Sequence, residues 1–242
     1  MSTTLFISDL HLDGSRPDIA DQFIAFLRGE ARSAHSLYIL GDLFEAWIGD
    51  DDPDEDKRRI QAELRALTAS GVQCFIMHGN RDFLIGKRFC KATGCTLLDD
   101  GSIATINGQR VALMHGDTLC TDDRDYQRLR RIVRNPFTKL LFRCMSLKRR
   151  QRLAAKIREG SKAHIERSMD AIMDVNVDAV AQAFKQHRVD LIVHGHTHRP
   201  AVHALLVNNQ PATRIVLGDW YTQGSVLRWN EVGYRLAALN RT

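Results

Sequence analysis

Short apolar runs alternate with longer amphipathic stretches over the first hundred residues of the chain. The runs have the length and composition of buried strands, and the stretches between them carry apolar residues at helical spacing. The alternation of strand and helix predicts an α/β fold with neighbouring strands in one sheet. The expected strands cover residues 5–7, 37–40 and 72–77, and the expected helices cover residues 18–32, 53–70 and 83–92.

The pattern changes after residue 100. Asn107-Gly108 separates two alternating runs, residues 102–106 and 110–114, and is a strong hairpin signal. Further helices are expected over residues 122–175, as an insertion, and 177–187, and further strands over residues 189–193, 201–207, 213–217, 225–229 and 234–238. We therefore expect one domain, residues 1–242, built as a sandwich of two packed β-sheets flanked by helices, with a helical cap inserted at 122–175.

Composition narrows the class of protein. Apolar residues make up 44% and charged residues 26% of the chain, as in ordinary globular proteins. The start of the chain lacks the basic and long apolar regions of a secretory signal, and no apolar run approaches the roughly 20 residues of a membrane span. The five cysteines are odd in number and form no CxxC pair, so we expect free thiols and a cytoplasmic location.

Charge is distributed unevenly. Residues 124–167 contain fifteen Lys or Arg and three Asp or Glu, a net charge of +12, whereas the rest of the chain carries −7. A local basic segment indicates a local anionic partner. Apolar residues are interleaved with the basic ones, so the segment suits either a helical cap packed on the domain or a surface facing lipid acyl chains and anionic head groups. Nucleic acid suits it less, because Phe137 and Phe142 lie among aliphatic residues and not along a polar groove.

Polar side chains follow five of the expected strands, at the point where each strand ends. Each of them has an ordinary explanation by itself: Asp42 as a helix cap, Asn80 as a turn residue, His115 as a core histidine. Together they are exclusively Asp, Asn and His, which makes a chance origin improbable. The set consists of Asp9 and His11, Asp42, Asn80, His115, and His196 and His198.

Seven such ligands are too many for one ion. They suit two divalent ions about 3.5–4 Å apart that share a bridging carboxylate. The set contains no Cys, and its carboxylate, amide and imidazole groups suit Mn²⁺, Fe²⁺ or Zn²⁺. Two such ions activate a water molecule as a nucleophile and hold a phosphoryl group for in-line attack. The expected reaction is hydrolysis of a phosphate ester or anhydride.

Asp9-x-His11, Gly41-Asp42, Gly79-Asn80, His115 and Gly195-His196-x-His198 resemble the signature of the calcineurin-like metallophosphoesterases. The resemblance implies the two-sheet sandwich of that family and a catalytic set that includes Asp42, Asn80, His115 and His196. It also implies a division of the ligands between two ions. Asp9, His11 and His198 would bind one ion, Asn80, His115 and His196 would bind the other, and Asp42 would bridge them.

One position departs from the family pattern. Many members have a His after the Asn, as a candidate acid for the leaving group, and this chain has Arg81. A guanidinium cannot donate a proton at neutral pH. We therefore expect Arg81 to bind a phosphate, and the leaving group to need little acid help. A phosphate leaving group, and hence a pyrophosphate substrate, fits that expectation.

Longer stretches, residues 41–51, 115–123, 172–176 and 194–203, closely resemble the UDP-2,3-diacylglucosamine pyrophosphohydrolase family of lipid A biosynthesis. The resemblance implies cleavage of UDP-2,3-diacylglucosamine to UMP and 2,3-diacylglucosamine 1-phosphate (lipid X) with two Mn²⁺ ions. It implies a peripheral enzyme at the cytoplasmic face of the inner membrane of a Gram-negative bacterium, and we expect a monomer that binds no nucleic acid.

The same resemblance implies the substrate contacts Asn80, Arg81, Asp123, Ser161 and His196. The family often has an Asn and a Lys further along the Ser161 helix, where this chain has Ile165 and Ser168, so Lys162, His164 and Arg167 are substitutes to consider. Two other functions stay open at this stage. One is a soluble phosphodiesterase of nucleotides such as dinucleoside polyphosphates, and the other is a membrane or nucleic-acid binding module with a vestigial site.

Overall fold

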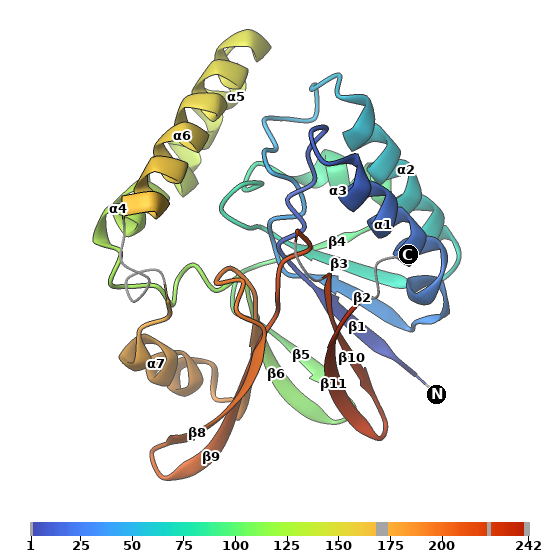
Figure 1. Ribbon diagram of the computed structural model, residues 1–242, viewed down its shortest axis with the longest axis vertical. Helices are drawn as coiled ribbons and strands as arrows, with labels where there is room; N and C mark the ends of the chain where they lie inside the picture. Colours follow the sequence, from blue (N-terminus) through green and yellow to red (C-terminus); the bar gives the residue numbers. More distant parts are fainter. Residues whose placement is uncertain (1, 168–173, 222–223, 240–242) are drawn as a thin grey trace.

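The computed structural model describes residues 2–167, 174–221 and 224–239, and in these ranges the strands form two facing sheets (Figure 1). The six-stranded sheet contains, in spatial order, β11 (Gly233–Ala238), β10 (Ser225–Asn230), β1 (Thr4–Ile7), β2 (Ser36–Ile39), β3 (Gln73–Met77) and β4 (Thr96–Leu98). The five-stranded sheet contains β5 (Ser102–Ile106), β6 (Gln109–Met114), β7 (Leu191–His194), β9 (Gln210–Val216) and β8 (Ala201–Val207).

The centre of each sheet is parallel. β1, β2 and β3 run parallel in the first sheet, and β6, β7 and β9 run parallel in the second. The carboxyl ends of parallel strands meet at one edge of a sheet, so the loops that follow them are brought together. Each sheet therefore has one edge at which the polar strand-end residues gather.

The two sheets pack through alternate residues of their strands. Phe6 and Tyr38 stack at a ring distance of 4.9 Å and face Val111, Leu113 and Val193 of the other sheet in one buried cluster. Their neighbours Leu5 and Ile7 point to the opposite face, into the helices. Both faces of β1 are buried, which explains why this strand is an unbroken apolar run.

Helices cover the outer face of each sheet, and the predicted two-sheet fold class is confirmed. The six-stranded sheet is covered by α1 (Pro17–Arg28), the short 3₁₀-helix η1 (Glu30–Ser33), α2 (Glu55–Ala69) and α3 (Lys87–Thr93), and the five-stranded sheet is covered by α7 (Val177–His187). The helix expected over residues 83–92 was placed four residues early, because Ile85 N donates to Asp82 O in a turn that precedes α3. The short strand β4 was missed.

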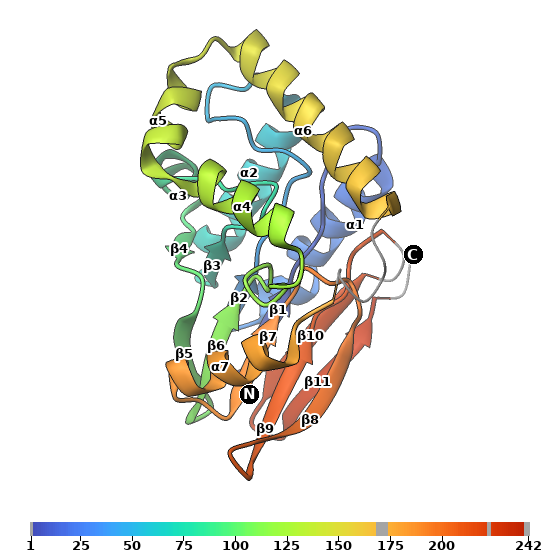
Figure 2. The same cartoon turned by 90° about the vertical axis from the view of Figure 1, so that its left-hand side faces the viewer.

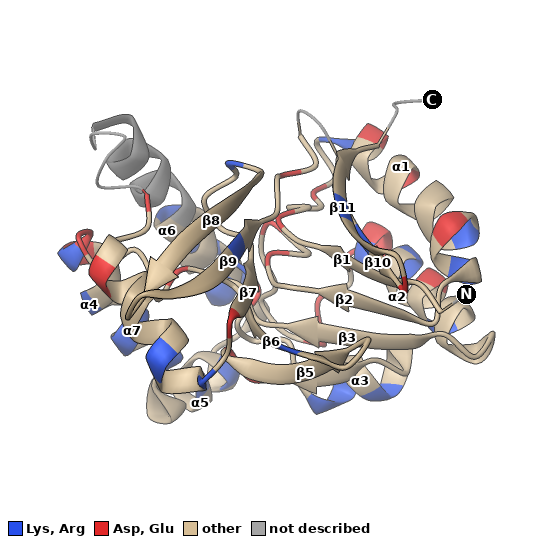
Figure 3. Cartoon of the chain, turned by 90° about the horizontal axis from the view of Figure 1, so that it is seen from below, with Lys and Arg blue, Asp and Glu red and all other residues tan. Residues whose placement is uncertain are grey.

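The described part of segment 122–175 forms three helices, which stand to one side of the sheets as a lobe (Figure 1 and Figure 2). They are α4 (Arg124–Arg134), α5 (Pro136–Cys144) and α6 (Leu147–Arg167). Pro136 cannot continue α4, and Asn135 starts the next helix by accepting a hydrogen bond from Phe137 N. Blue segments of Lys and Arg are visible on α4 and α5 in Figure 3. Among the described residues, no helix has the length and apolar character needed to cross a membrane.

Candidate metal centre between the two sheets

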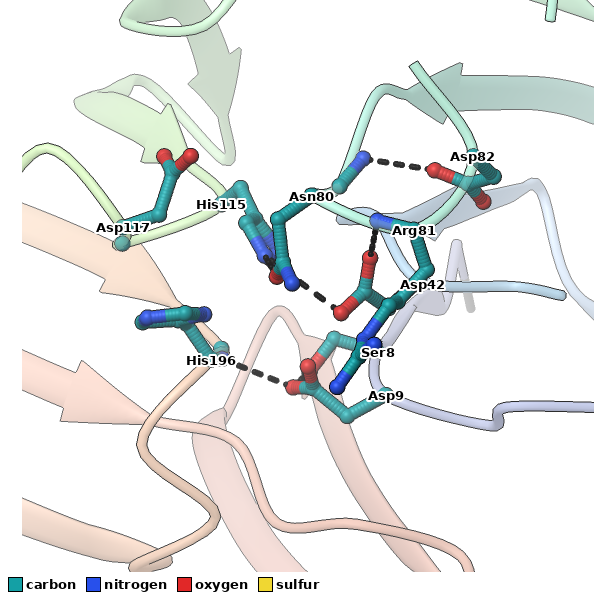
Figure 4. A network of polar contacts seen from close by, with 12 residues as sticks. Ser8, Asp9, Asp42, Asn80, Arg81, Asp82, His115, Asp117 and His196 are labelled. Carbon is teal, nitrogen blue, oxygen red and sulfur yellow. Dashed lines mark hydrogen bonds and ion pairs between the residues drawn. The ribbon is translucent and has the colours of Figure 1, made fainter. Parts of the chain in front are cut away.

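The seven predicted ligands come from both sheets and lie at facing edges. Asp9 and His11 follow β1, Asp42 follows β2 and Asn80 follows β3, whereas His115 follows β6 and His196 and His198 follow β7. Figure 4 shows the side chains of Asp9, Asp42, Asn80, His115 and His196 around one space. The structure thus brings together residues that are up to 189 positions apart in the chain.

Three ligand atoms cluster on one side of Asp42. His198 Nε2 lies 3.5 Å from Asp9 Oδ1 and 3.4 Å from His11 Nε2. His11 Nε2 lies 3.6 Å from Asp42 Oδ2. Spacings of this size are those of atoms that share one ion, because two ligands at about 2.1 Å from a metal are roughly 3–3.6 Å apart.

A second cluster lies on the other side. His115 Nε2 is 3.7 Å from Asp42 Oδ2 and 3.1 Å from Asn80 Oδ1, and the His115 and His196 rings are 5.0 Å apart between centroids. Asp42 Oδ2 is therefore placed between His11 and His115, where a bridging oxygen would lie. Asp9 also has an oxygen within 4.8 Å of the ligand atoms of Asp42 and His115, so it lies closer to this second group than the sequence suggested.

The ligands have an uncommon backbone conformation. Five of the seven have a left-handed φ between 50° and 72°: Asp9, His11, Asp42, His196 and His198. Such values are unfavourable for residues with a side chain and gather at functional sites. Glycine is required beside them, since a Cβ at Gly79 would overlap Asp42 Oδ1 and a Cβ at Gly195 would overlap Asp9 Oδ2.

The donor set fits divalent cations. Asp9 is fully buried, and its Oδ1 has no hydrogen-bond partner among the described residues, although it faces His198. A buried carboxylate oxygen without a donor is costly unless a cation neutralises it. His115 Nδ1 donates to Leu40 O at 2.9 Å, which leaves the Nε2 lone pair directed to the site.

Charge and burial shift the pKa values of the site in different directions. Burial lowers the pKa of His115, but Asp42, Asp117 and Asp9 outweigh it and raise that pKa to about 9. Burial and the charge of His115 lower the pKa of His196 to about 4. Without metal, a protonated His115 therefore neutralises part of the negative charge of the carboxylates in the site.

Three acidic residues that sequence reasoning missed support the ligands. Glu45 Oε2 accepts a hydrogen bond from His11 Nδ1 at 2.9 Å, and Asp219 Oδ2 lies 3.9 Å from His198 Nδ1. Asp82 accepts from Leu43 N and Gly79 N and so joins the two loops that carry Asp42 and Asn80. Burial and Asp42 raise the pKa of Asp82 to about 6. A sequence signal existed for Asp219, because Gly218-Asp219 follows β9 as Gly41-Asp42 follows β2.

A cavity of about 80 Å³, which opens to solvent, adjoins the ligands. Its polar lining comes from Glu45, Asn80 and Arg81 and from Tyr126, Arg130 and Arg134 of α4, and its apolar lining comes from the loops after β2 and β3 and from the inserted helices. The lining includes Trp47, Ile48, Phe83, Leu84, Leu129, Val133, Phe142, Ala154 and Ile157. The candidate metal centre therefore adjoins a largely apolar cavity, called the chamber below.

Only some of the predicted substrate contacts line the cavity. Asn80 and Arg81 line the cavity, and Arg81 N donates to Asp42 Oδ1 at 2.9 Å. Asp123 is buried and caps α4 by accepting from Tyr126 N at 2.9 Å. The predicted contacts Ser161, Lys162, His164 and Arg167, and the departures Ile165 and Ser168, lie outside the residues whose side chains the structure describes.

Comparison with known proteins identifies the family of the chain. Residues 2–200 match the calcineurin-like phosphoesterase family. The chain belongs to this family. As a calcineurin-like phosphoesterase, it is 53% identical over 225 residues to the UDP-2,3-diacylglucosamine hydrolases of an Escherichia coli O139:H28 strain and of Shigella flexneri, covering 93% of this chain and 94% of each relative.

Proteins with little sequence identity to this calcineurin-like phosphoesterase share its fold. A Thermotoga maritima protein with a solution structure superposes with a TM-score of 0.50 at 15% identity, over 99% of this chain and all of that one. At such low identity the likeness concerns the fold alone. The residues that surround the metal-type centre must therefore carry the argument about function.

Proposed function

We propose that this phosphoesterase hydrolyses the pyrophosphate bond of UDP-2,3-diacylglucosamine and releases UMP and 2,3-diacylglucosamine 1-phosphate in lipid A biosynthesis. The observation that supports the proposal is that Asn80, which adjoins the ligand groups of Asp9 and Asp42, also lines the largely apolar cavity under the inserted helices. A substrate with a pyrophosphate at one end and acyl chains at the other matches both parts. The names of the 53% identical relatives support the same substrate.

The proposed cofactor is a pair of Mn²⁺ ions. Asp9, His11 and His198 would hold one, Asn80, His115 and His196 the other, and Asp42 both. When bound, two such ions supply an activated water and neutralise charge on the phosphoryl group. Two Mn²⁺ ions suit the mixed oxygen and nitrogen donors, which exclude a thiolate site.

The chain's own residues position the substrate. Asn80 and Arg81 belong to the polar lining of the cavity, where an amide and a guanidinium bind phosphate oxygens. The Arg81 backbone N–H donates to Asp42 Oδ1, and Arg81 Nη1 lies 3.9 Å from Glu45 Oε1, so the residue is anchored beside the ligand Asp42. A phosphate leaving group needs no proton from Arg81, which keeps its charge throughout.

The proposed setting is the cytoplasmic face of the inner membrane of a Gram-negative bacterium, with the enzyme as a monomer attached peripherally. The exposed apolar residues of α5 and the basic charge of the insertion support attachment to an anionic lipid surface. The substrate's acyl chains reside in such a surface, and the cavity opens beneath the same helices.

Release of UMP from detergent-dispersed UDP-2,3-diacylglucosamine tests the proposal. We expect metal-depleted protein to be inactive and added Mn²⁺ to restore turnover. Asp42→Ala and His115→Ala should each lower kcat by about 10³-fold or more, because each removes a ligand that positions a reactive ion. The exposed carboxylate Asp18 provides a control, and Asp18→Ala should retain full activity.

Two outcomes would contradict the proposal. Retained turnover in both Asp42→Ala and His115→Ala would exclude the two-metal centre. Faster turnover of dinucleoside polyphosphates than of the lipid substrate would instead assign a soluble nucleotide phosphodiesterase. Hydrolysis in ¹⁸O-labelled water should place the label in UMP, which identifies the phosphorus on the uridine side as the one attacked.

A further inference from the structure

Asp117 is a buried carboxylate outside the ligand set, two residues after His115. Its side chain is fully covered and meets three side chains of α4. Tyr126 Oη donates to Asp117 Oδ2 at 2.9 Å and Arg130 Nε at 2.7 Å, and Arg134 Nη2 lies 3.3 Å from the same oxygen. One residue of a ligand loop thus receives donors from more than two turns of the inserted helix.

The contact extends to a second ligand loop. Arg134 Nη2 also donates to Gly79 O at 3.0 Å, directly before the ligand Asn80. Gln127 Nε2 donates to the backbone oxygens of Asp117 and Cys120 at 2.7 and 3.0 Å. α4 is therefore bonded to the loops after both β3 and β6, one from each sheet.

The bonded face of α4 is also the wall of the cavity. Tyr126, Arg130 and Arg134 contact Asp117, and Leu129 and Val133, which alternate with them at helical spacing, line the chamber. Any shift of α4 relative to Asp117 moves this wall relative to Asn80 and Arg81. Asp117, which receives three of the side chains that hold α4, therefore contributes both to the position of the helix over the candidate metal centre and to the shape of the chamber.

We infer that Asp117 is a positioning residue, which fixes the inserted helix α4 over the ligand loops and so aligns a long apolar substrate with the reacting phosphate. The inference rests on the proposed function for the identity of that substrate. It assigns Asp117 no contact with the reacting atoms. Small phosphodiesters, which do not fill the chamber, depend on the ligand loops alone.

A comparison of two substrates tests this role. Asp117→Asn keeps the shape of the side chain and removes its charge, so it weakens the hydrogen bonds from the arginines. We expect the ratio of kcat/KM for UDP-2,3-diacylglucosamine to kcat/KM for bis(p-nitrophenyl) phosphate to fall about tenfold, mainly through KM. Asp125→Asn makes the same change on the outer face of α4, where the side chain is 80% exposed, and should change the ratio by less than about twofold.

Amide hydrogen exchange provides a readout without substrate. In Asp117→Asn, the amides of α4 should exchange about tenfold faster, while those of β1 and β2 keep the wild-type rate. Arg134→Lys is a milder variant in case Asp117→Asn does not fold. Arg134 contacts both Gly79 O and Asp117 through Nη2, and the shorter lysine side chain cannot place its ammonium at that point, so the same ratio should fall about threefold.

Equal losses on both substrates would overturn the inference, because Asp117 would then act on the metal centre itself. An unchanged ratio or unchanged exchange in α4 would also overturn it. Failure of the wild-type protein to hydrolyse the lipid substrate would be a different result. It would reject the proposed function, while exchange in α4 would still decide whether Asp117 holds the helix.

Discussion

The strand-end ligands are held in place by their own backbone neighbours. Asp9 N donates to Gly41 O at 3.1 Å, and His11 N donates to Asp42 O at 2.9 Å, so the loops after β1 and β2 are hydrogen-bonded side by side. These bonds compensate the left-handed backbone of the three ligands, which costs about 1–2 kcal/mol per residue. The ligand geometry is therefore established by the fold and not by the arriving ion.

At the residue scale, His115 makes metal binding pH-dependent. Its pKa of about 9 means that the metal-free imidazole is protonated at pH 7, whereas a ligand must offer the Nε2 lone pair. Metal binding below pH 9 must therefore release a proton, and affinity should rise with pH by up to about tenfold per unit until pH 9. Calorimetric Mn²⁺ titrations at pH 7, in two buffers with different ionisation enthalpies, should report at least one released proton, to which His115 contributes and to which His198, whose pKa Asp9 also raises, adds.

His115→Gln is the control for that titration, since it should lose the contribution of His115 along with most of the affinity. An affinity that stays constant between pH 6 and 8 would contradict the pKa assigned to His115.

The sequence alone predicted the ligand residues better than the acidic residues that hold the ligand loops in place. Asp9, Asp42 and His115 each follow an apolar run, so their shared position could be predicted from local pattern. Asp82 and Asp117 act across loops from different strands, and nothing in the local sequence shows which backbone donors or arginines reach them. Their roles depend on which loops meet in space, which one sequence does not reveal. The assignment of the seven ligands to two ions stays a prediction.

At the element scale, α5 presents apolar side chains to the outside. Phe137 is 83% exposed, and Leu140 and Leu141 are 60% and 63% exposed. Isolated exposed apolar residues are ordinary, but three on one short helix next to basic residues indicate a contact surface. The insertion thus has an inner face that lines the cavity and an outer face suited to lipid.

We expect the double variant Phe137→Ser, Leu141→Ser to bind anionic vesicles about a hundredfold or more weakly, because each apolar side chain contributes about 1.5–3 kcal/mol when it is buried in the bilayer. Sedimentation with phosphatidylglycerol vesicles measures this. Val232, which is 88% exposed in the turn between β10 and β11, provides the matched control Val232→Ser with wild-type binding. Equal binding by the double variant would show that α5 does not meet the membrane.

Element boundaries were predictable where a local signal marks them. The hairpin at Asn107-Gly108 and the helix α7 agree with the sequence to within about one residue. β4 has only three residues, too few for a periodic pattern, and is defined by its pairing with β3. The insertion was predicted as helical, but its division into three helices depends on Pro136 and on the turn at Met145, which were not weighed.

At the scale of the whole molecule, metal binding should stabilise the entire fold. The ligands join both sheets and span residues 9–198, so an unfolded chain has no comparable site. At a free Mn²⁺ concentration about 100 times its Kd, the added stability is about 2.7 kcal/mol, which raises Tm by about 5–10 °C in a chain of this size. Thermal scans with chelator and with Mn²⁺ measure the shift, and Asp42→Ala should show almost none. A Tm that is independent of metal in the wild type would contradict a resident metal centre.

The inserted helices and α7 all lie between β6 and β7, which are hydrogen-bonded parallel neighbours. The lobe leaves the sheet layer after β6 and returns to the start of α7, where Asn176 Nδ2 donates to Asp122 Oδ1, and none of the seven predicted metal ligands belongs to it. Replacing the lobe requires no change in the order or pairing of the strands that carry the hydrolytic centre. Evolution can vary the size and shape of the substrate chamber while the reaction chemistry is inherited intact, and a protein engineer can exchange residues 124–174 as one module on the same terms.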